Sequence, residues 1–470
     1  MIRIVAAKEF TLLRRDPRVR LTAAILVLML LVALISAVAR YQDVSQERAA
    51  AQEIINEQWN NQGEKNPHAA AHYGIYAIRP VTPLSFFDTG VTAYSGVSIW
   101  LEAHRRNRPG GRPADDDTAA GRASELTGAY TLQVLLPLFI ILLAFQAFAG
   151  EREQGTLRQL LGTGVPAHAL LLGKALGISA AVGLVIGPVL VLALVALLLT
   201  PGGLAEIPQA LLMMLSYVAY GAIFLFFSLA ISARLSSSQS ALVALLAFWA
   251  VSSFVLPRVT SDLSRWLYPL PTSVQFERAI SEDVETGVDG VSSAERINQR
   301  REQTLKLYNV EREADLPINF QGLIFSLQEE LDAQVYGKHF DKLYGLMASQ
   351  QSLYGIVSLA SPRMAVELAS MEWAGTSVST QRDFADHAEG FRREFIEVLN
   401  QDLTFNSTAG STDYRSGPEL WNQVGAYEYS GVAMSRVLSR SAPFMLVLLL
   451  WTVGSALSAW LAVRNLKVSV

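Results

Sequence analysis

A short charged segment, residues 150–161, begins where the apolar run 130–149 ends. It combines acids, bases, a glycine and leucines at helical spacing: Glu151, Arg152, Glu153, Gly155, Thr156, Leu157, Leu160 and Leu161. A polar helix at the mouth of a membrane span can contact a water-soluble protein, which groups buried in lipid cannot do. The chain has no recognisable pairing of a nucleophile with a base, so the segment suggests mechanical coupling and not catalysis.

Two histidines have the spacing of metal ligands. His68 and His72 lie four residues apart, so in a helix both imidazoles would face the same ion. No third ligand is evident, and the chain contains no cysteine. We therefore expect no metal site and interpret the two histidines as a hydrogen-bonded surface pair.

The chain has no phosphate-binding loop. Such a loop needs glycine-lined backbone amides followed by Lys and then Ser or Thr, but Gly173-Lys174 is followed by Ala175 within an apolar run. No cofactor is therefore expected on this chain, and any ATP and Mg²⁺ would bind to a partner. Apart from Lys174, the apolar runs contain no ionisable side chain, which argues against an ion-coupled transporter.

The composition is that of an integral membrane protein. Of 470 residues, 51% are hydrophobic and 17% charged, and the mean hydropathy is +0.28. A hydrocarbon core of about 30 Å takes about 20 apolar residues of helix, and backbone groups in lipid must be paired within the segment. Six spans are predicted: 21–39, 130–149, 170–199, 209–231, 240–256 and 442–463.

Residues 1–20 predict an amphipathic helix that lies on the cytosolic membrane surface. The residues that define it are Lys8, Glu9, Phe10, Arg14 and Arg15, with Glu9 an exception inside the apolar face. Because basic residues also follow the last span, both termini, the coupling segment 150–169 and the tail 464–470 are expected in the cytosol. A cleavable signal peptide ending at Ala37-Val38-Ala39 is the alternative, and the long apolar run argues against it.

Two long polar inserts, 40–129 and 257–441, are then expected outside the cytoplasm. Helical signals recur there: Ser292 with Glu295 predicts a capping box, and Thr380 with Asp383 predicts another helix start. The predicted fold class is an all-α integral membrane protein with six transmembrane helices and a mostly helical extracytoplasmic domain formed by the two inserts.

Glycines recur at four-residue spacing in the third span. Gly173 with Gly177, and Gly183 with Gly187, allow helices to approach closely in lipid. We predict that they pack helices, with a part in substrate passage as the alternative. Pro188 removes a backbone donor and predicts a kink.

These features resemble the type-two permeases of ATP-binding-cassette transporters, in particular a bacterial subgroup with large extracytoplasmic inserts. The resemblance spans nearly the whole chain. Its principal carriers are Lys8-Glu9-Phe10, Arg14-Arg15-Asp16-Pro17-Arg18, Glu151-Arg152-Glu153, Gly155-Thr156-Leu157, Leu160-Leu161 and Leu172-Gly173-Lys174. Looser matches lie in the inserts, at His72-Tyr73-Gly74, Pro83-Leu84-Ser85, Leu101-Glu102-Ala103-His104, Ser361-Pro362 and Gly375-Thr376.

The resemblance implies a permease subunit of the bacterial cytoplasmic membrane that exports a substrate. It implies a dimer with a second copy or a paralogue, and cytosolic ATPase subunits that bind ATP and Mg²⁺. Nothing in the sequence predicts a nucleic-acid partner. Two alternatives remain: an ATPase-driven device that acts on a periplasmic protein partner, and a passive membrane sensor or scaffold.

Overall fold

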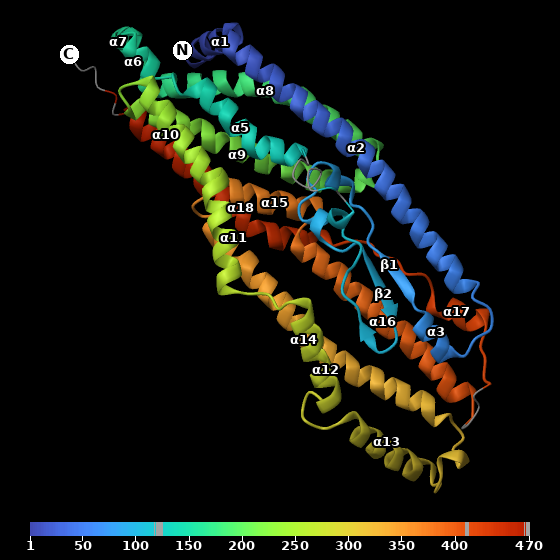
Figure 1. Cartoon of the computed structure of the whole chain (residues 1–470). Helices are drawn as coiled ribbons and strands as arrows, with labels where there is room; N and C mark the ends of the chain where they lie inside the picture. The colour runs from blue at the N-terminus through green and yellow to red at the C-terminus, as the bar shows by residue number, and fades with distance from the viewer. Residues whose placement is uncertain (117, 119–125, 409–412, 465, 467–470) are drawn as a thin grey trace.

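The structure is a computed structural model that describes residues 1–116, 118, 126–408, 413–464 and 466 (Figure 1). The molecule is elongated, and in a bundle of long helices the N-terminus and the end of α18 (Met434–Arg464) lie at one end. We call that end of the bundle the proximal end. The part beyond the other end, residues 41–116, 268–357 and 376–433, is called the distal domain.

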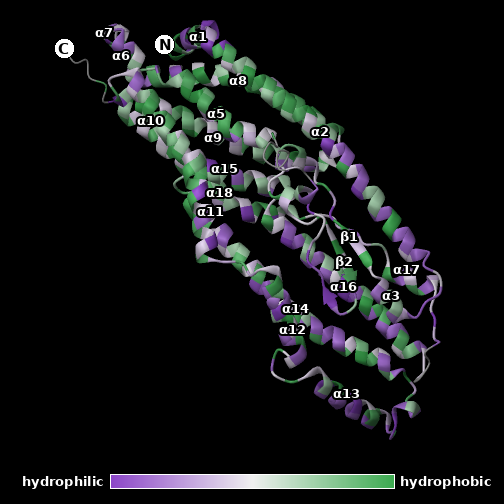
Figure 2. Ribbon diagram, viewed as in Figure 1, coloured by the Kyte–Doolittle hydropathy of each residue, from purple (hydrophilic) through white to green (hydrophobic). Residues whose placement is uncertain are grey.

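Six helical segments among the described residues are long and apolar enough to cross a membrane, and they contain the six predicted spans. Hydrophobic residues dominate this bundle, whereas the distal domain mixes hydrophilic and hydrophobic residues (Figure 2). The segments are α2 (Pro17–Asn60), α5 with α6 (Gly128–Glu153), α8 (Ala167–Leu199), η4 with α9 (Gly203–Arg234), α10 with η5 and α11 (Ser238–Leu267), and α18 (Met434–Arg464). The all-α membrane fold is thereby confirmed.

Helix α2 joins the two parts of the molecule. Its 44 residues contain no glycine and no proline after Pro17, and the Asp16 side chain caps its first turn by accepting from the backbone N–H of Arg18 at 2.8 Å. At 1.5 Å per residue such a helix is about 66 Å long, twice the hydrocarbon thickness. The predicted span 21–39 is thus the apolar part of a rod that continues into the distal domain (Figure 1).

The distal domain contains a small sheet that the sequence did not predict. Strand β2 (Ser98–Glu102) lies between β1 (Ile75–Ile78) and β3 (Arg105–Arg106), and both pairings are antiparallel. Strands this short leave too few residues for an alternating pattern. The helices of this domain are α3 (Pro67–Tyr73), α12 (Ser273–Thr286), α13 (Ser293–Tyr308), α14 (Phe320–Val357), α16 (Val378–Asn406) and α17 (Pro418–Val424).

Residues from both inserts share one hydrophobic core in the distal domain. Trp59 lies edge-on to Trp421 and to Phe395, with ring centroids 5.8 Å apart in both pairs. The Trp59 indole donates to the Trp421 carbonyl at 3.2 Å. The two inserts therefore form a single folded unit.

A buried helix, α15 (Pro362–Ala374), lies between the distal domain and the bundle, where it packs on α9 and α18. Ser361 caps its start, and Gly375 ends it in the left-handed conformation. Ser292 likewise caps α13 by accepting from the backbone N–H of Glu295, which is one of the two bonds of the predicted capping box. The prediction that Thr380 caps the start of α16 was wrong. Ser377 is the cap, and its hydroxyl oxygen accepts a hydrogen bond from the backbone N–H of Thr380.

Candidate coupling site

Helix α1 (Ile2–Arg15) packs directly on α8 because two glycines leave room for it. A Cβ on Gly173 would lie 2.5 Å from Cβ of Val5, and a Cβ on Gly177 would lie 2.7 Å from Cβ of Glu9. Any larger residue would therefore force the two helices apart. Phe10 is partly buried on the same side, whereas the side chains of the last turn, Arg14 and Arg15, are exposed.

A network of four charges, centred on the buried Lys174, joins α1, α8 and the charged segment. The Lys174 side chain is only 2% exposed, and its Nζ lies 3.1 Å from Glu9 Oε2 and 3.0 Å from Glu151 Oε1. Lys8 Nζ lies 3.2 Å from the same oxygen of Glu151. An unpaired buried charge costs several kcal/mol, so separating these helices from one another would be unfavourable. The ion pairs therefore keep α1 and the charged segment in contact with α8.

The charged segment forms two short helices, α6 (Ala149–Glu153) and α7 (Thr156–Gly162). Gly155 sits between them at φ 74°, a left-handed conformation that favours glycine. Leu157 is buried, and Leu160 and Leu161 pack partly buried against the core of the bundle. The segment thus has an apolar underside and an exposed polar face at the proximal end of the molecule (Figure 1).

Arg152 and Glu153 attach α6 to the junction between α9 (Ile207–Arg234) and α10 (Ser238–Ala250). The Arg152 guanidinium donates to the carbonyls of Ala233, at 2.7 Å, and of Leu235, which satisfies the end of α9. Glu153 accepts from the backbone N–H of Ser238, at 2.9 Å, and from its hydroxyl, which satisfies the start of α10. A displacement of α6 would therefore move two spans together.

One further contact fixes the start of α6. The Ser232 hydroxyl accepts from the backbone N–H groups of Phe148, at 3.0 Å, and Ala149, at 3.1 Å. It also donates to the Phe145 carbonyl at 2.8 Å. Helix α6 is thus bonded to the end of α9 both at its start, through Ser232, and near its own end, through Arg152.

The structure brings together residues that the sequence had marked separately. Glu9 was an exception on an apolar face, and Lys174 was the one charge in the apolar runs; here they form an ion pair. Sequence reasoning missed this pairing and also missed Ser232 and Ser238. The available signal was that a buried lysine and a glutamate on an apolar face each need an opposite charge.

The second pair of glycines in α8 lies apart from this site. A Cβ on Gly183 or on Gly187 would meet nothing within 4 Å among the described residues. Pro188 is exposed within a helix that continues past it to Leu199. Within one copy of the chain, only the first glycine pair packs two helices.

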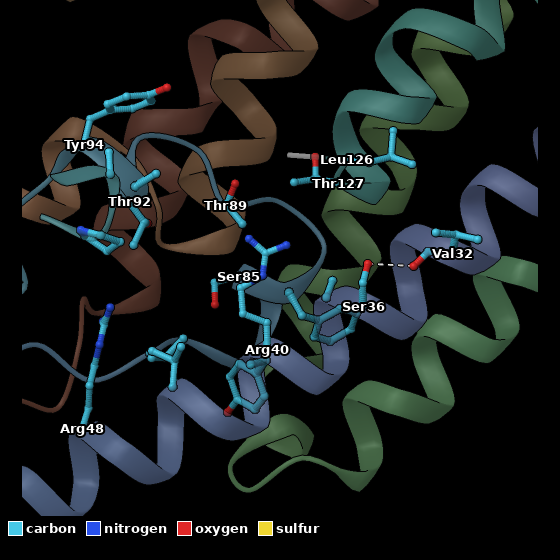
Figure 3. A pocket seen from close by; sticks show the side chains of 18 residues that line it. Val32, Ser36, Arg40, Arg48, Ser85, Thr89, Thr92, Tyr94, Leu126 and Thr127 are labelled. Atoms are coloured by element: carbon cyan, nitrogen blue, oxygen red, sulfur yellow. Dashed lines mark hydrogen bonds between the residues drawn. The ribbon is translucent and has the colours of Figure 1, made fainter. Parts of the chain in front are cut away.

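A cavity of about 540 Å³ lies where α2 leaves the bundle (Figure 3). Val32, Ser36 and Arg40 line it from α2, and Thr89 and Tyr94 line it from the loop on the opposite side. Its volume is typical of sites for small organic ligands. Apolar, hydroxyl and guanidinium groups together suit an amphipathic molecule.

The histidine pair is in the distal domain, far along the chain from the coupling site. His68 Nε2 and His72 Nε2 are 3.2 Å apart, so the two rings are within hydrogen-bonding distance. The sequence made no third ligand evident, but in the structure His104 lies beside both rings. Burial, followed by the nearby His72 and His104, lowers the pKa of His68 to about 4.

The chain was compared with models of known protein families and with curated proteins. The family model described as "ABC-2 family transporter protein" matches residues 3–461, which include every element of the coupling site and of the distal domain. No curated protein matches the chain.

Proposed function

This chain belongs to the ABC-2 family of transporter proteins, and we propose that it couples ATP hydrolysis by a separate cytosolic ATPase to the export of a substrate. The observation that carries this proposal is the network around Lys174, which joins α1, α6 and α8. Force applied to the exposed face of α6 and α7 would reach α8 through Glu151 and would reach α9 and α10 through Arg152 and Glu153. ATP and Mg²⁺ would bind to the ATPase.

The distribution of positive charge supports a cytosolic position for the proximal end. Basic residues gather there, in α1, in the first turns of α2 and at the end of α18. Positive charge near the ends of spans marks the cytosolic side. The distal domain then lies outside the cytoplasm, and in a bacterial cytoplasmic membrane it faces the periplasm.

The cavity beside α2 is the proposed substrate site. It opens where the bundle meets the distal domain, and apolar side chains share its wall with Arg40 and Arg48. The cargo we propose is therefore hydrophobic or peptide-like, with a polar or anionic end. A second copy of the chain, or a paralogue, would complete a dimer, and the face of α8 around Gly183 and Gly187 is open to such a partner.

A second function is favoured by the form of α2. One uninterrupted helix runs from the coupling end into the core of the distal domain, where Trp59 is buried. Such a rod would transmit motion to a periplasmic protein without passing a solute through the spans. The passive sensor or scaffold differs from both functions because it needs no ATPase.

The first test is to purify the tagged chain in mild detergent, identify any ATPase that accompanies it, and measure ATP hydrolysis by the complex. We expect a near-stoichiometric ATPase whose activity responds to the permease. Recovery of the chain alone under several gentle conditions would favour the scaffold. Activity that rises with added amphipathic compounds supports export, whereas a stable periplasmic protein bound to the distal domain supports the mechanical function.

The second test changes the coupling segment. Replacing Glu151 and Glu153 by Lys places a third cation beside Lys8 and Lys174 and removes the acceptor at the start of α10. We expect the complex to insert in the membrane but to lose the stimulation of ATP hydrolysis. The matched control replaces the exposed Glu394 and Glu397 of α16 by Lys. Equal stimulation in both variants would contradict the assignment of the segment.

A further inference from the structure

Three of the chain's six histidines meet at one place in the distal domain, and no step of the proposed transport cycle uses them. Ligand atoms of His68, His72 and His104 all lie within 4.8 Å of one another. The ring centroids form a nearly equilateral triangle, with sides of 4.7, 5.3 and 5.5 Å. We propose that these three imidazoles bind one divalent transition-metal ion of the zinc class.

The spacing of the nitrogens fits such an ion. Two nitrogens that each lie about 2.0–2.1 Å from a tetrahedral zinc ion are about 3.3 Å apart. His68 Nε2 and His72 Nε2 are 3.2 Å apart, so little movement is needed to place an ion between them. They extend from successive turns of α3, which Asn66 caps by accepting from the backbone N–H of His68 at 2.9 Å.

The third imidazole is presented by a strained turn. Ala103 and His104 form the two-residue connection between β2 and β3, and His104 has φ 63°. The left-handed conformation costs a residue with a side chain about 1–2 kcal/mol, and glycine or asparagine would normally occupy it. Such strain in a turn is typical of residues that are held in place for a function.

Helix α14 supplies an outer layer of contacts around the three rings. The Phe325 ring stacks on His68, with centroids 3.5 Å apart and planes within 3°. Glu329 accepts from the backbone N–H of His104 at 2.9 Å, and Asp332 Oδ2 lies 3.5 Å from His104 Nδ1. In metal-bound histidines a carboxylate near Nδ1 favours the proton on that atom and leaves Nε2 for the metal, and Asp332 is placed to do this for His104.

The donor set indicates which ions fit. Imidazole nitrogens suit zinc, copper, nickel and iron, whereas calcium and magnesium prefer oxygen ligands. Three protein ligands leave one position of a tetrahedral ion open, and His72 is exposed, so water can reach that position. A bound ion would fasten α3 to the β2–β3 turn and hold both against α14.

The site is independent of the proposed transport function and is tested without an ATPase. The full chain, purified in detergent and stripped with a chelator, is titrated with Zn²⁺ alone while bound zinc and thermal unfolding are measured. We expect one zinc per chain and an unfolding temperature that rises with zinc concentration, because ligands of the folded state stabilise it. Ca²⁺ and Mg²⁺ should produce neither effect.

Three variants test the ligand set. His104→Asn suits the left-handed turn but removes the ligand, and His72→Asn changes an exposed position; each should lower zinc affinity at least 100-fold. Asp332→Asn keeps all three ligands and should lower the affinity by about 10–100-fold, the usual effect of an outer-layer change. The control is His168→Asn, an exposed histidine near the start of α8, which should bind zinc as the unchanged chain does.

X-ray absorption at the zinc edge should count three imidazole nitrogens in the unchanged chain. The proposal is overturned if the unchanged chain binds no zinc, or if His104→Asn and His72→Asn bind it as tightly as His168→Asn. Because His72 is exposed and His104→Asn relieves the turn, loss of folding is not expected to obscure the result. Should His104→Asn nevertheless fail to fold, His72→Asn and Asp332→Asn decide.

Discussion

Among the described residues, two of the buried cations, Lys174 and Arg392, each lie between two glutamates, and the two centres are built differently. Lys174 at the proximal end bonds to Glu9 and Glu151, which lie on two other helices. Arg392 in the distal domain bonds through Nε and Nη2 to both oxygens of Glu389, at 2.8 Å each, on its own helix α16. Its Nη1 bonds to Glu329 of α14 and to the Glu102 carbonyl.

The difference indicates which part of the molecule is fixed and which can move. An arginine guanidinium binds a carboxylate through two parallel N–H groups, which fixes their relative orientation. A lysine ammonium is a compact charge on a flexible stem, so it can move from one carboxylate to another. Burial opposes the charge of Arg392, but the bonds to Glu389 and Glu329 outweigh it, so its pKa is raised. We therefore interpret the Arg392 centre as a rigid joint of the distal domain and the Lys174 centre as the joint that changes during coupling.

The largest expected effect comes from breaking the rigid joint. Arg392→Met leaves Glu329 and Glu389 without a cation, and removal of one partner from a buried ion pair costs about 3–5 kcal/mol. Limited proteolysis should show cleavage of α14 and α16 at a lower temperature. Arg393→Met, the exposed neighbour, is the control and should change nothing. Equal resistance in the two variants would show that the joint is not structural.

Breaking the movable joint should have a smaller effect on folding and a larger one on activity. Lys174→Met leaves the buried Glu9 without a cation, whereas Lys8 still contacts Glu151. We therefore expect a cost at the low end of the same range, about 3 kcal/mol. We expect α1 to detach from α8 and stimulation of the ATPase to be lost.

Because the chain has no cysteine, a single Val5→Cys substitution reports this detachment through its rate of labelling. Lys8→Met breaks only a half-exposed pair, worth about 0–1 kcal/mol, and serves as the control. If the cysteine is labelled equally slowly in Lys174→Met and in Lys8→Met, the ion pairs of Lys174 do not keep α1 against α8.

The two glycine pairs of α8 give the next test. Gly177→Ala would force its Cβ to within 2.8 Å of the Ala6 carbonyl, and such overpacking costs about 1–3 kcal/mol. Gly187→Ala meets nothing within 4 Å and should stabilise the helix by about 0.5–1 kcal/mol. Unfolding in detergent should therefore shift in opposite directions. A loss in Gly187→Ala would instead point to a partner that covers this face.

The smallest destabilisation among these tests is expected at the turn between α6 and α7. Gly155→Ala has open space around its Cβ, so only the left-handed backbone resists it, at about 1–2 kcal/mol. To relieve this backbone strain, α7 should change its angle to α6, which should weaken binding of the ATPase. A pull-down titration measures the affinity for the ATPase. Gly162→Ala, at the last position of α7, also has open space and no such conformation, and it should bind the ATPase normally.

The sequence predicted those parts of the fold that follow from local composition. Apolar runs of span length located all six membrane helices, because backbone groups in lipid have no other way to be paired. The charged segment, the leader helix and the mostly helical inserts were also predicted. The β1–β2–β3 sheet was not, because strands of four, five and two residues leave too little periodicity to recognise.

The sequence singled out most residues of the coupling site but not the contacts between them, and it predicted no metal site. Glu9 and Lys174 were each noticed as exceptions, yet they are separated by 165 positions, and nothing local states that α1 lies on α8. The same is true of His104, whose place beside His68 and His72 depends on the pairing of Ile75 with Leu101.

By itself the sequence determined that this protein is a six-span membrane protein, since hydrophobicity and helix length are properties of single segments. Only the tertiary structure decided which charges and which imidazoles meet. Those contacts depend on close helix packing at Gly173 and Gly177 and on a two-residue strand connection at His104. The physical reason is that a buried charge specifies the need for a partner but not where along the chain that partner lies.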